Sequence, residues 1–455
     1  MMAPSKAIVK AYRIRNRDMK VLVLNGSPSG NHSVTLYTVY YIQKYFPECS
    51  FEILQVGQQI RRMEGNFTPC IEKLEAADLI LFCYPVYTFL VPSQLHRFIE
   101  LMKEHQVQVA GKFASQITTS LHFYDITAHA FVEENCKDLG MRYITGLSAD
   151  MEDLQKEQGR REALDYFRFV LWNMRSGAGI SAGSAGREGK GPASGKRICV
   201  VADFSSDTEG TLRRMTGRFQ ELCSQEVQVT DIGEFPFAGG CLGCFHCASD
   251  GKCIYKDGFD DYLRTRIQSA DATVYAFTVK DHSMGYRFKL FDDRQFCNGH
   301  RTVTMGKPVG YLVDGDLSRE NNLKILIESR AQVGGNFLAG IASSQEENAD
   351  AGIGKLAGTL EYAMEHDYRP PKNFYGVGGL KIFRDLIYQM RGLMKADHIF
   401  YKQHGFYDFP QKRKGRIAAM YLVGGMMRNK KLQKKIGGKM TEGMILPYKN
   451  ILKKY

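Results

Sequence analysis

The sequence predicts two doubly wound α/β domains in tandem, followed by a basic helical extension. Three observations lead to this prediction. Two series of five short apolar runs follow one another, and each series alternates with helical patterns. A Gly/Ala/Ser-rich stretch at 176–195 separates them and has the composition of a flexible linker. After about residue 350 the strand patterns stop, and helical, basic segments follow.

Each predicted strand is a short run rich in Val, Ile and Leu, as expected for a parallel strand buried on both faces. The first series lies at 20–25, 51–57, 77–87, 111–120 and 141–151. The second series lies at 197–203, 227–233, 270–279, 308–315 and 335–343. This alternation predicts α/β domains over 18–175 and 196–350, joined by the linker at 176–195, and a helical basic extension over 351–455.

The positive charge of the chain is concentrated at its C-terminal end. The net charge is +12, and residues 401–455 hold fourteen Lys and Arg against two acids, a surplus that equals the whole net charge. This distribution disfavours a nucleic-acid binder with an extended basic face. The apolar run at 417–427 is too short to span a membrane but borders this basic segment. Such a segment is typical of a solvated face, of a helix that lies on a membrane surface, or of a docking site for an acidic redox protein.

The N-terminus and the cysteine usage favour a cytoplasmic protein. The first twenty residues contain no apolar core of the kind found in signal peptides. Eleven cysteines, an odd number spread over a long chain, do not suggest a disulfide framework. Cys83 and Cys199 fall in predicted strands, where a buried packing role is expected.

The turn after the first strand, GSPSGNHSVT (26–35), has the residues that a phosphate site needs. Gly26 and Gly30 allow close approach of the backbone, and hydroxyl donors are present. The turn also leads into a helix, whose N-terminus attracts anions. The alternative is that these residues only form the turn and cap the helix.

Loops that follow the third and fourth strands are expected at the same sheet edge as this turn. The third-strand loop contains Tyr87 and Phe89, which can pack on a flat heteroaromatic ring, and Pro85 and Pro92 stiffen it. Residues 118–124 would form a third wall. The residues therefore predict a pocket for a ligand with a phosphate and a ring.

With the turn GSPxGxxSxT and the later ADxIxFxxPVY, residues 20–150 resemble the NAD(P)H-dependent FMN reductase family of flavodoxin-like flavoproteins. The resemblance implies FMN as cofactor and NAD(P)H as electron donor. The FMN phosphate would be held by Ser27, Ser33, Val34 and Thr35. The isoalloxazine ring would be bordered by Pro85, Val86, Tyr87 and Thr88, with Ser120 near its other side.

The second half carries a different motif, FAGGCLGCFHCASDGKCIYKD, at 237–257. Its four thiols, Cys241, Cys244, Cys247 and Cys253, are spaced closely enough to converge on one centre, as soft metals favour. Zinc is a less favoured alternative, because zinc sites usually have more widely separated pairs or a histidine ligand. A thiol-rich loop that serves packing is the other alternative. The spacing resembles the iron–sulfur flavoprotein branch of the same family, which implies a [4Fe–4S] cluster here.

The second half lacks the flavin signals of the first. Its corresponding turn, ADFSSDTEGTL, places Asp207 and Glu209 where a phosphate dianion would lie, and like charges repel at short range. Its third-strand loop has no PVY sequence. Flavin binding is therefore not expected in this domain.

Together these observations predict a cytoplasmic flavin-dependent NAD(P)H oxidoreductase. Electrons would pass from NAD(P)H through FMN, to or via the cluster, to a small acceptor such as a quinone, azo or nitro compound. Since family members with a cluster are dimers or larger, the resemblance implies a fused pseudo-dimer, itself able to form higher oligomers. Candidates for proton donation are Tyr87, His122 and Tyr124, with surface or packing roles as the alternative. The alternative function is an electron-transfer or redox-sensing flavoprotein without its own substrate.

Overall fold

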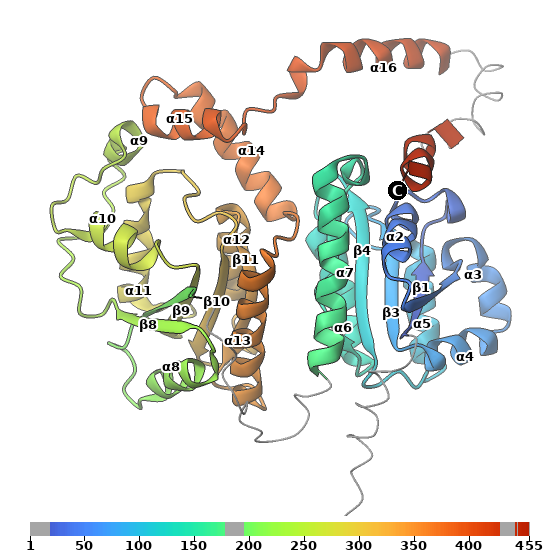
Figure 1. Cartoon of the computed structure of the whole chain (residues 1–455), viewed down its shortest axis with the longest axis horizontal. Helices are drawn as coiled ribbons and strands as arrows, with labels where there is room; N and C mark the ends of the chain where they lie inside the picture. The colour runs from blue at the N-terminus through green and yellow to red at the C-terminus, as the bar shows by residue number, and fades with distance from the viewer. Residues whose placement is uncertain (1–18, 178–194, 428–441, 444, 455) are drawn as a thin grey trace, which may run out of the picture. The chain divides into compact units, whose positions relative to one another are not determined.

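The structure, a computed structural model, describes residues 19–177, 195–427, 442–443 and 445–454 (Figure 1). The chain forms two compact units. The first contains the described residues before 184 together with those after 410, and the second contains those in between. The predicted linker at 176–195 lies almost entirely outside the described residues.

The first unit is built on a parallel sheet with the order β2-β1-β3-β4, and β5 and β6 both pair with β4. Its strands are β1 (Met19–Asn25), β2 (Cys49–Leu54), β3 (Leu79–Pro85), β4 (Phe113–Ser120), β5 (Arg142–Tyr143) and β6 (Leu147–Asp150). The predicted fifth strand is thus divided in two. The break falls at Gly146, whose backbone passes so close to Gln116 that a Cβ would overlap it.

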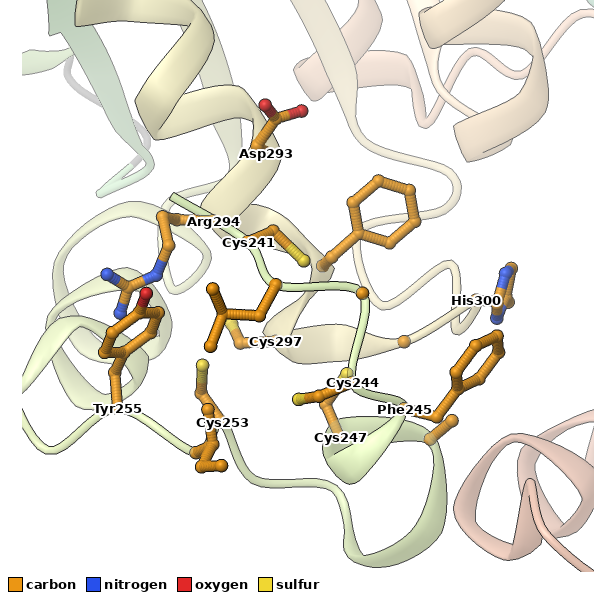
Figure 2. Close-up of a pocket in the computed structure, with 16 residues that line it drawn as sticks. Cys241, Cys244, Phe245, Cys247, Cys253, Tyr255, Asp293, Arg294, Cys297 and His300 are labelled. Carbon is orange, nitrogen blue, oxygen red and sulfur yellow. The ribbon is translucent and has the colours of Figure 1, made fainter. Parts of the chain in front are cut away.

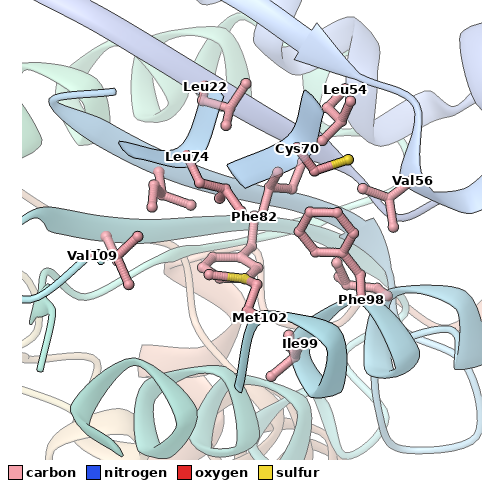
Figure 3. Close-up of a cluster of buried hydrophobic side chains, with 14 of the residues drawn as sticks. Leu22, Leu54, Val56, Cys70, Leu74, Phe82, Phe98, Ile99, Met102 and Val109 are labelled. Atoms are coloured by element: carbon pink, nitrogen blue, oxygen red, sulfur yellow. The ribbon is translucent and has the colours of Figure 1, made fainter. Parts of the chain in front are cut away.

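Helices cover both faces of this sheet (Figure 1). They are α2 (Val34–Tyr45), α3 (Val56–Gly65), α4 (Thr68–Ala76), α5 (Ser93–Glu104), α6 (Asp125–Asp138) and α7 (Glu157–Gly177). The helices α3 to α6 bury a large apolar cluster against one face (Figure 3). Phe46, which directly follows α2, packs on Phe167 of α7 with ring centroids 4.8 Å apart. The first unit also contains α16 (Lys414–Met427) and the helical residues 445–454.

The second unit repeats the architecture with the strand order β8-β7-β9-β10-β11, again parallel. Its strands are β7 (Arg197–Ala202), β8 (Glu226–Asp231), β9 (Ala272–Thr278), β10 (Pro308–Asp314) and β11 (Phe337–Ser343). One face packs on α8 (Thr211–Leu222) and α13 (Ala349–His366). The other packs on α10 (Phe259–Tyr262), α11 (Gly285–Arg294) and α12 (Asn321–Gly334).

The helices after residue 350 divide between several roles. Leu356 and Leu360 of α13 belong to the core of the second sheet. The next helix, α14 (Phe374–Gln389), packs on α12, and α15 (Lys395–Gln403) packs on α9 (His246–Asp250), which lies within the cysteine motif. None of the described helices has the length and hydropathy needed to cross a lipid bilayer.

The predicted fold class is confirmed: two parallel, doubly wound α/β sheets are followed by helices. In both units the first strand lies beside the second and the third, which is the flavodoxin-like order. In such sheets ligands bind beyond the carboxyl ends of the strands, near the point where the order reverses.

Candidate functional site

The turn after β1 is shaped by a buried asparagine that ends the strand. The Asn25 side chain donates to the Gly30 carbonyl (3.0 Å) and to Gln55 (2.8 Å), and its oxygen accepts from the Ser27 amide (3.2 Å). Gly30 has a φ of +54° and lies so close to Gln58 that a Cβ would overlap it. The positive φ favours glycine at this position. The result is a compact, fixed turn in front of α2.

The N-terminus of α2 is left without an acidic partner from its own sequence. Ser33 precedes the helix but makes no side-chain cap hydrogen bond, and the first turn contains no Asp or Glu. The Thr35 hydroxyl is buried and bonded to the Thr119 hydroxyl of β4 (2.6 Å). A helix N-terminus carries a partial positive charge and N–H donors, so this end of α2 suits an anion.

A cavity of about 560 Å³ opens in front of this helix end. All nine residues that the sequence assigned to FMN lie in its lining: Ser27, Ser33, Val34, Thr35, Pro85, Val86, Tyr87, Thr88 and Ser120. The structure thus brings three loops together, as the parallel strand order requires. The volume lies in the range of pockets that hold cofactor-sized ligands.

The two loops that face the helix end are held in uncommon backbone conformations. Thr88 and Phe89 in one loop, and His122 and Tyr124 in the other, have positive φ values between +47° and +69°. Such residues cost about 1–3 kcal/mol each and persist only where the surroundings impose them. Phe89 contacts Phe123 and Tyr124 with ring centroids 5.3 Å apart in both pairs. An exposed aromatic group therefore stands beside the cavity.

A buried polar network supports the second of these loops from behind. His122 Nδ1 lies 2.9 Å from the Asp125 carboxylate, to which Ser148 also donates (2.6 Å). The His122 amide donates to the Ser120 hydroxyl (2.8 Å). Burial acts to raise the pKa of Asp125, but the hydrogen bonds from His122 and Ser148 hold this pKa below its ordinary value. Asp125 is therefore a carboxylate that fixes the loop.

Of the three predicted proton donors, only Tyr87 lies in the cavity lining. The Tyr124 ring is partly exposed and packs in the aromatic group beside the cavity. The buried His122 ring is directed at Asp125. The structure therefore gives His122 the supporting role that the sequence left as the alternative.

Sequence reasoning missed several lining residues. Ser29 and His32 lie within the turn itself, and Thr119 and Phe123 lie in the wall that follows β4, so their positions were implied but not assigned. Met151 follows β6, and Ile445 belongs to the C-terminal helical residues. No local pattern links Ile445 to a site formed almost three hundred residues earlier.

In the second unit, the four cysteines of the motif line one cavity of about 190 Å³ (Figure 2). A fifth thiol, that of Cys297, joins them from beyond α11. Burial raises the pKa of Cys297 to about 12 and also raises the pKa of Cys247. The donor set suits a soft metal or an iron–sulfur cluster. However, no three His, Cys, Asp or Glu side chains among the described residues are close enough together to hold a metal ion.

Two arginines brace the cysteine loop. Arg294 pairs with Asp257 through two bonds of 2.7 and 2.8 Å and donates to the Gly239 carbonyl (2.9 Å). This pairing holds the pKa of Asp257 at about 2. The Arg294 guanidinium also lies 4.4 Å from the centre of the Tyr255 ring. Its Nε is buried and has no hydrogen-bond partner among the described residues.

The second arginine connects the loop to the helices that cover it. Arg301 donates to the Cys247 carbonyl (3.1 Å) and to the buried carboxylate of Asp397 in α15 (2.7 Å). The His300 amide and ring also bond to Asp397, at 3.1 and 3.0 Å. The helical segment at 374–403 is therefore part of the support of the cysteine site.

The fold and this set of loops define a doubly wound α/β domain with a cavity between an open helix N-terminus and aromatic loops. Residues 19–131 match the family model described as NADPH-dependent FMN reductase. This part of the first unit is therefore similar to that family.

Two curated proteins are similar to parts of the chain. An iron-sulfur flavoprotein of Archaeoglobus fulgidus is 26% identical over 177 residues, which cover 36% of this chain and 79% of that protein. An iron-sulfur flavoprotein of Clostridioides difficile is 24% identical over 139 residues, which cover 29% of this chain and 61% of that protein.

Among solved structures, an FMN-dependent NADH-azoreductase from Bacillus anthracis in complex with FMN is similar at 13% identity and a TM-score of 0.25. The similarity covers 35% of this chain and 98% of that chain.

Proposed function

We propose that the first unit binds FMN in the cavity at the N-terminus of α2 and oxidises NAD(P)H. The observation that carries this proposal is the end of α2, which has no acid and no side-chain cap and faces a cofactor-sized cavity. The family match over residues 19–131 supports the same cofactor. Bound FMN would supply the redox chemistry, because its ring system can accept and release electrons.

The residues of the chain bind and orient the cofactor. The hydroxyls of Ser27 and Ser33 and the first amides of α2 provide donors for a phosphate. The loop at 85–88 provides an apolar and aromatic wall for a ring. The polar network at Asp125 fixes the loop that follows β4. This part of the cavity wall is therefore in place before a ligand binds.

The acceptor is a small planar compound such as a quinone, an azo dye or a nitroaromatic. The exposed aromatic group of Phe89, Phe123 and Tyr124 beside the cavity supports this assignment, because aromatic rings stack on flat acceptors. Of the three proton donors predicted from the sequence, Tyr87 is the one that belongs to the cavity lining.

The four cysteines of the second unit are the candidate ligands of a [4Fe–4S] cluster, which would supply electron transfer if it were bound. The thiol donor set, the shared cavity and the buried cation of Arg294 beside it support this assignment, because a thiolate-bound cluster is anionic. The two relatives named as iron-sulfur flavoproteins support it as well. Zinc and a metal-free thiol loop are the alternatives. Iron and sulfide analysis of anaerobically purified protein decides between them. If the protein is fully loaded with flavin but contains no iron and no sulfide, the cluster is excluded.

Steady-state oxidation of NADH and NADPH tests the enzyme assignment. The FMN-loaded chain is expected to turn over a quinone, an azo dye or a nitroaromatic. If flavin reduction requires a protein donor and no small acceptor is turned over, the chain is an electron-transfer or redox-sensing protein instead.

A further inference from the structure

The C-terminal end of the chain forms part of the first unit's cavity. Residues 445–454 are helical, and Ile445 is 1% exposed and belongs to the cavity lining. Within the described residues, every other lining residue comes from the region between Ser27 and Met151. The first unit is therefore completed by chain that follows the whole of the second unit.

Specific contacts hold this segment in place. The Tyr448 hydroxyl donates to the Met151 carbonyl (2.5 Å) and accepts from the Gln155 side chain (3.1 Å). The Tyr448 ring lies 6.0 Å from the Tyr37 ring of α2. Lys44 of α2 donates to the Leu452 carbonyl. These contacts place the segment against the same helix whose N-terminus faces the cavity.

Apolar packing explains why Ile445 in particular faces inward. It forms a buried cluster with Tyr37, Tyr41, Leu154 and Tyr448. The next residue, Leu446, is 55% exposed. Two neighbouring apolar residues of similar size thus point to opposite sides, one to the cavity and one to solvent.

We propose that Ile445, which the helical residues 445–454 hold in the cavity lining, is a binding residue for FMN. This inference rests on the proposed function. The turn at 26–35 and the loops at 85–89 and 119–123 form most of the cavity lining, and Met151 and Ile445 complete it. Retention of the cofactor then depends on the C-terminal end of the chain.

The test measures FMN affinity by quenching of flavin fluorescence in the full chain and in the variants Ile445→Ala, Ile445→Asp and Leu446→Ala. We expect Ile445→Ala to weaken FMN binding about tenfold, Ile445→Asp to weaken it further, and Leu446→Ala to have no effect. FMN should also protect the exposed Lys449 and Lys453 region from trypsin, a readout independent of turnover.

The outcomes separate this inference from the proposal on which it rests. A wild-type chain that binds no FMN contradicts the proposed function. A wild-type chain that binds FMN, with Ile445→Ala and Leu446→Ala binding it equally well, contradicts the inference alone. Melting followed by Trp172, the single tryptophan and a residue of α7, verifies that each variant keeps the first unit folded.

A second inference rests on the exposed helix α16. Every side chain described in this helix, from Lys414 to Gly425, is exposed. Its apolar residues follow one another without interruption, so they lie on all sides of the helix: Ile417, Ala418, Ala419, Met420, Tyr421, Leu422 and Val423. A helix that is apolar all round is normally covered by protein or lipid.

The charges around α16 indicate which of these covers it. Residues 410–441 contain ten Lys and Arg and no Asp or Glu, and the cations stand on both sides of the apolar run. Each cation near an anionic lipid surface contributes about 1 kcal/mol of attraction. The apolar run at 417–427 has 11 residues, which span about 16 Å as a helix, too short for the roughly 30 Å of a hydrocarbon core. We infer that α16 lies in the interface of an anionic membrane.

Flotation of the full chain with vesicles tests this assignment. We expect binding to phosphatidylcholine vesicles that contain phosphatidylserine, little binding to phosphatidylcholine alone, and weakening by salt. Leu422→Asp, at a position 71% exposed, should reduce binding at least tenfold, whereas Ile382→Asp, at a position 68% exposed on α14, should not. If the chain does not bind vesicles, the inference is contradicted. If the chain instead self-associates and Leu422→Asp abolishes this self-association, α16 is covered by a second copy of the chain and not by lipid.

Discussion

The N-termini of α2 and α8 occupy the same position in two sheets of the same strand order, yet they differ in what faces them. In front of α2 there is a cavity, and the first helical turn contains no acid. In front of α8 the Asp207 carboxylate accepts hydrogen bonds from the amides of Leu212 (3.1 Å) and Arg213 (3.0 Å). In the second unit a carboxylate of the chain itself occupies the space in front of the helix N-terminus. In the first unit the cavity occupies this space.

The turns before the two helices differ in the same way. The first contains the neutral Asn25, which bonds to the backbone of the turn. The second contains the buried Asp203, whose carboxylate accepts from the amide and the hydroxyl of Ser205 at 3.0 and 2.5 Å. We therefore expect that the second unit, with two carboxylates at this helix end, does not bind an anion there.

The largest expected effect comes from giving α2 the carboxylate that α8 has. Ser33→Asp places a negative charge at the helix end, where it both caps the amides and repels a phosphate. We expect FMN affinity to fall by about 100-fold or more, roughly 3 kcal/mol at a separation of about 4 Å. The measurement is flavin fluorescence quenching. Ser33→Asn, which caps without charge, should weaken binding much less, and equal losses in the two variants would contradict the electrostatic account.

Acid is expected to destabilise the first unit through a histidine of α6. Burial lowers the pKa of His129 from 6.5 to about 4, and its ring bonds to Thr118 (2.9 Å). Between these values the unfolded chain binds a proton that the folded unit does not, so stability is lost as the pH falls from about 6.5 to 4. We expect a loss of up to about 3 kcal/mol in denaturant unfolding followed by Trp172 fluorescence.

The matched variant for the acid experiment is His129→Gln, which can keep a hydrogen bond to Thr118 but cannot take up a proton. Its stability should vary less between pH 6.5 and 4 than that of the wild type. The same slope in both proteins would show that another group is responsible.

The smallest expected effect comes from removing the carboxylate of the second unit. Asp207→Ala leaves the first amides of α8 without their acceptor and should destabilise this helix end by about 1 kcal/mol. Faster hydrogen exchange at Leu212 and Arg213 would report the loss, and Asp207→Asn should show less of it. The Ala variant should still bind no FMN in the second unit, since Asp203 remains.

Local sequence patterns sufficed for the strands and for the loops at their ends. All ten predicted strands are present, because buried parallel strands are continuous apolar runs. The nine residues assigned to FMN share one cavity, because parallel strands bring their carboxyl ends to one edge. The division of the last strand of the first sheet at Gly146 was not predicted, since it depends on the approach of Gln116.

The residues that sequence reasoning missed depend on contacts between distant segments. Ile445 reaches the first unit's cavity from beyond the second unit. Asp397 meets His300 and Arg301 almost one hundred residues away, and Cys297 joins the cysteine cavity from outside the CxxC spacing. Tertiary packing brings these residues together, and no local period or motif encodes it.

The number of FMN molecules held per chain shows whether the two helix ends differ in anion binding. The wild type, Ser33→Asp and Asp207→Ala would each be saturated with FMN, freed of excess ligand by gel filtration and denatured, and the released flavin counted. The account predicts one FMN per chain in the wild type and in Asp207→Ala, and a large loss in Ser33→Asp. Two FMN per wild-type chain, or full retention of FMN by Ser33→Asp, would contradict it.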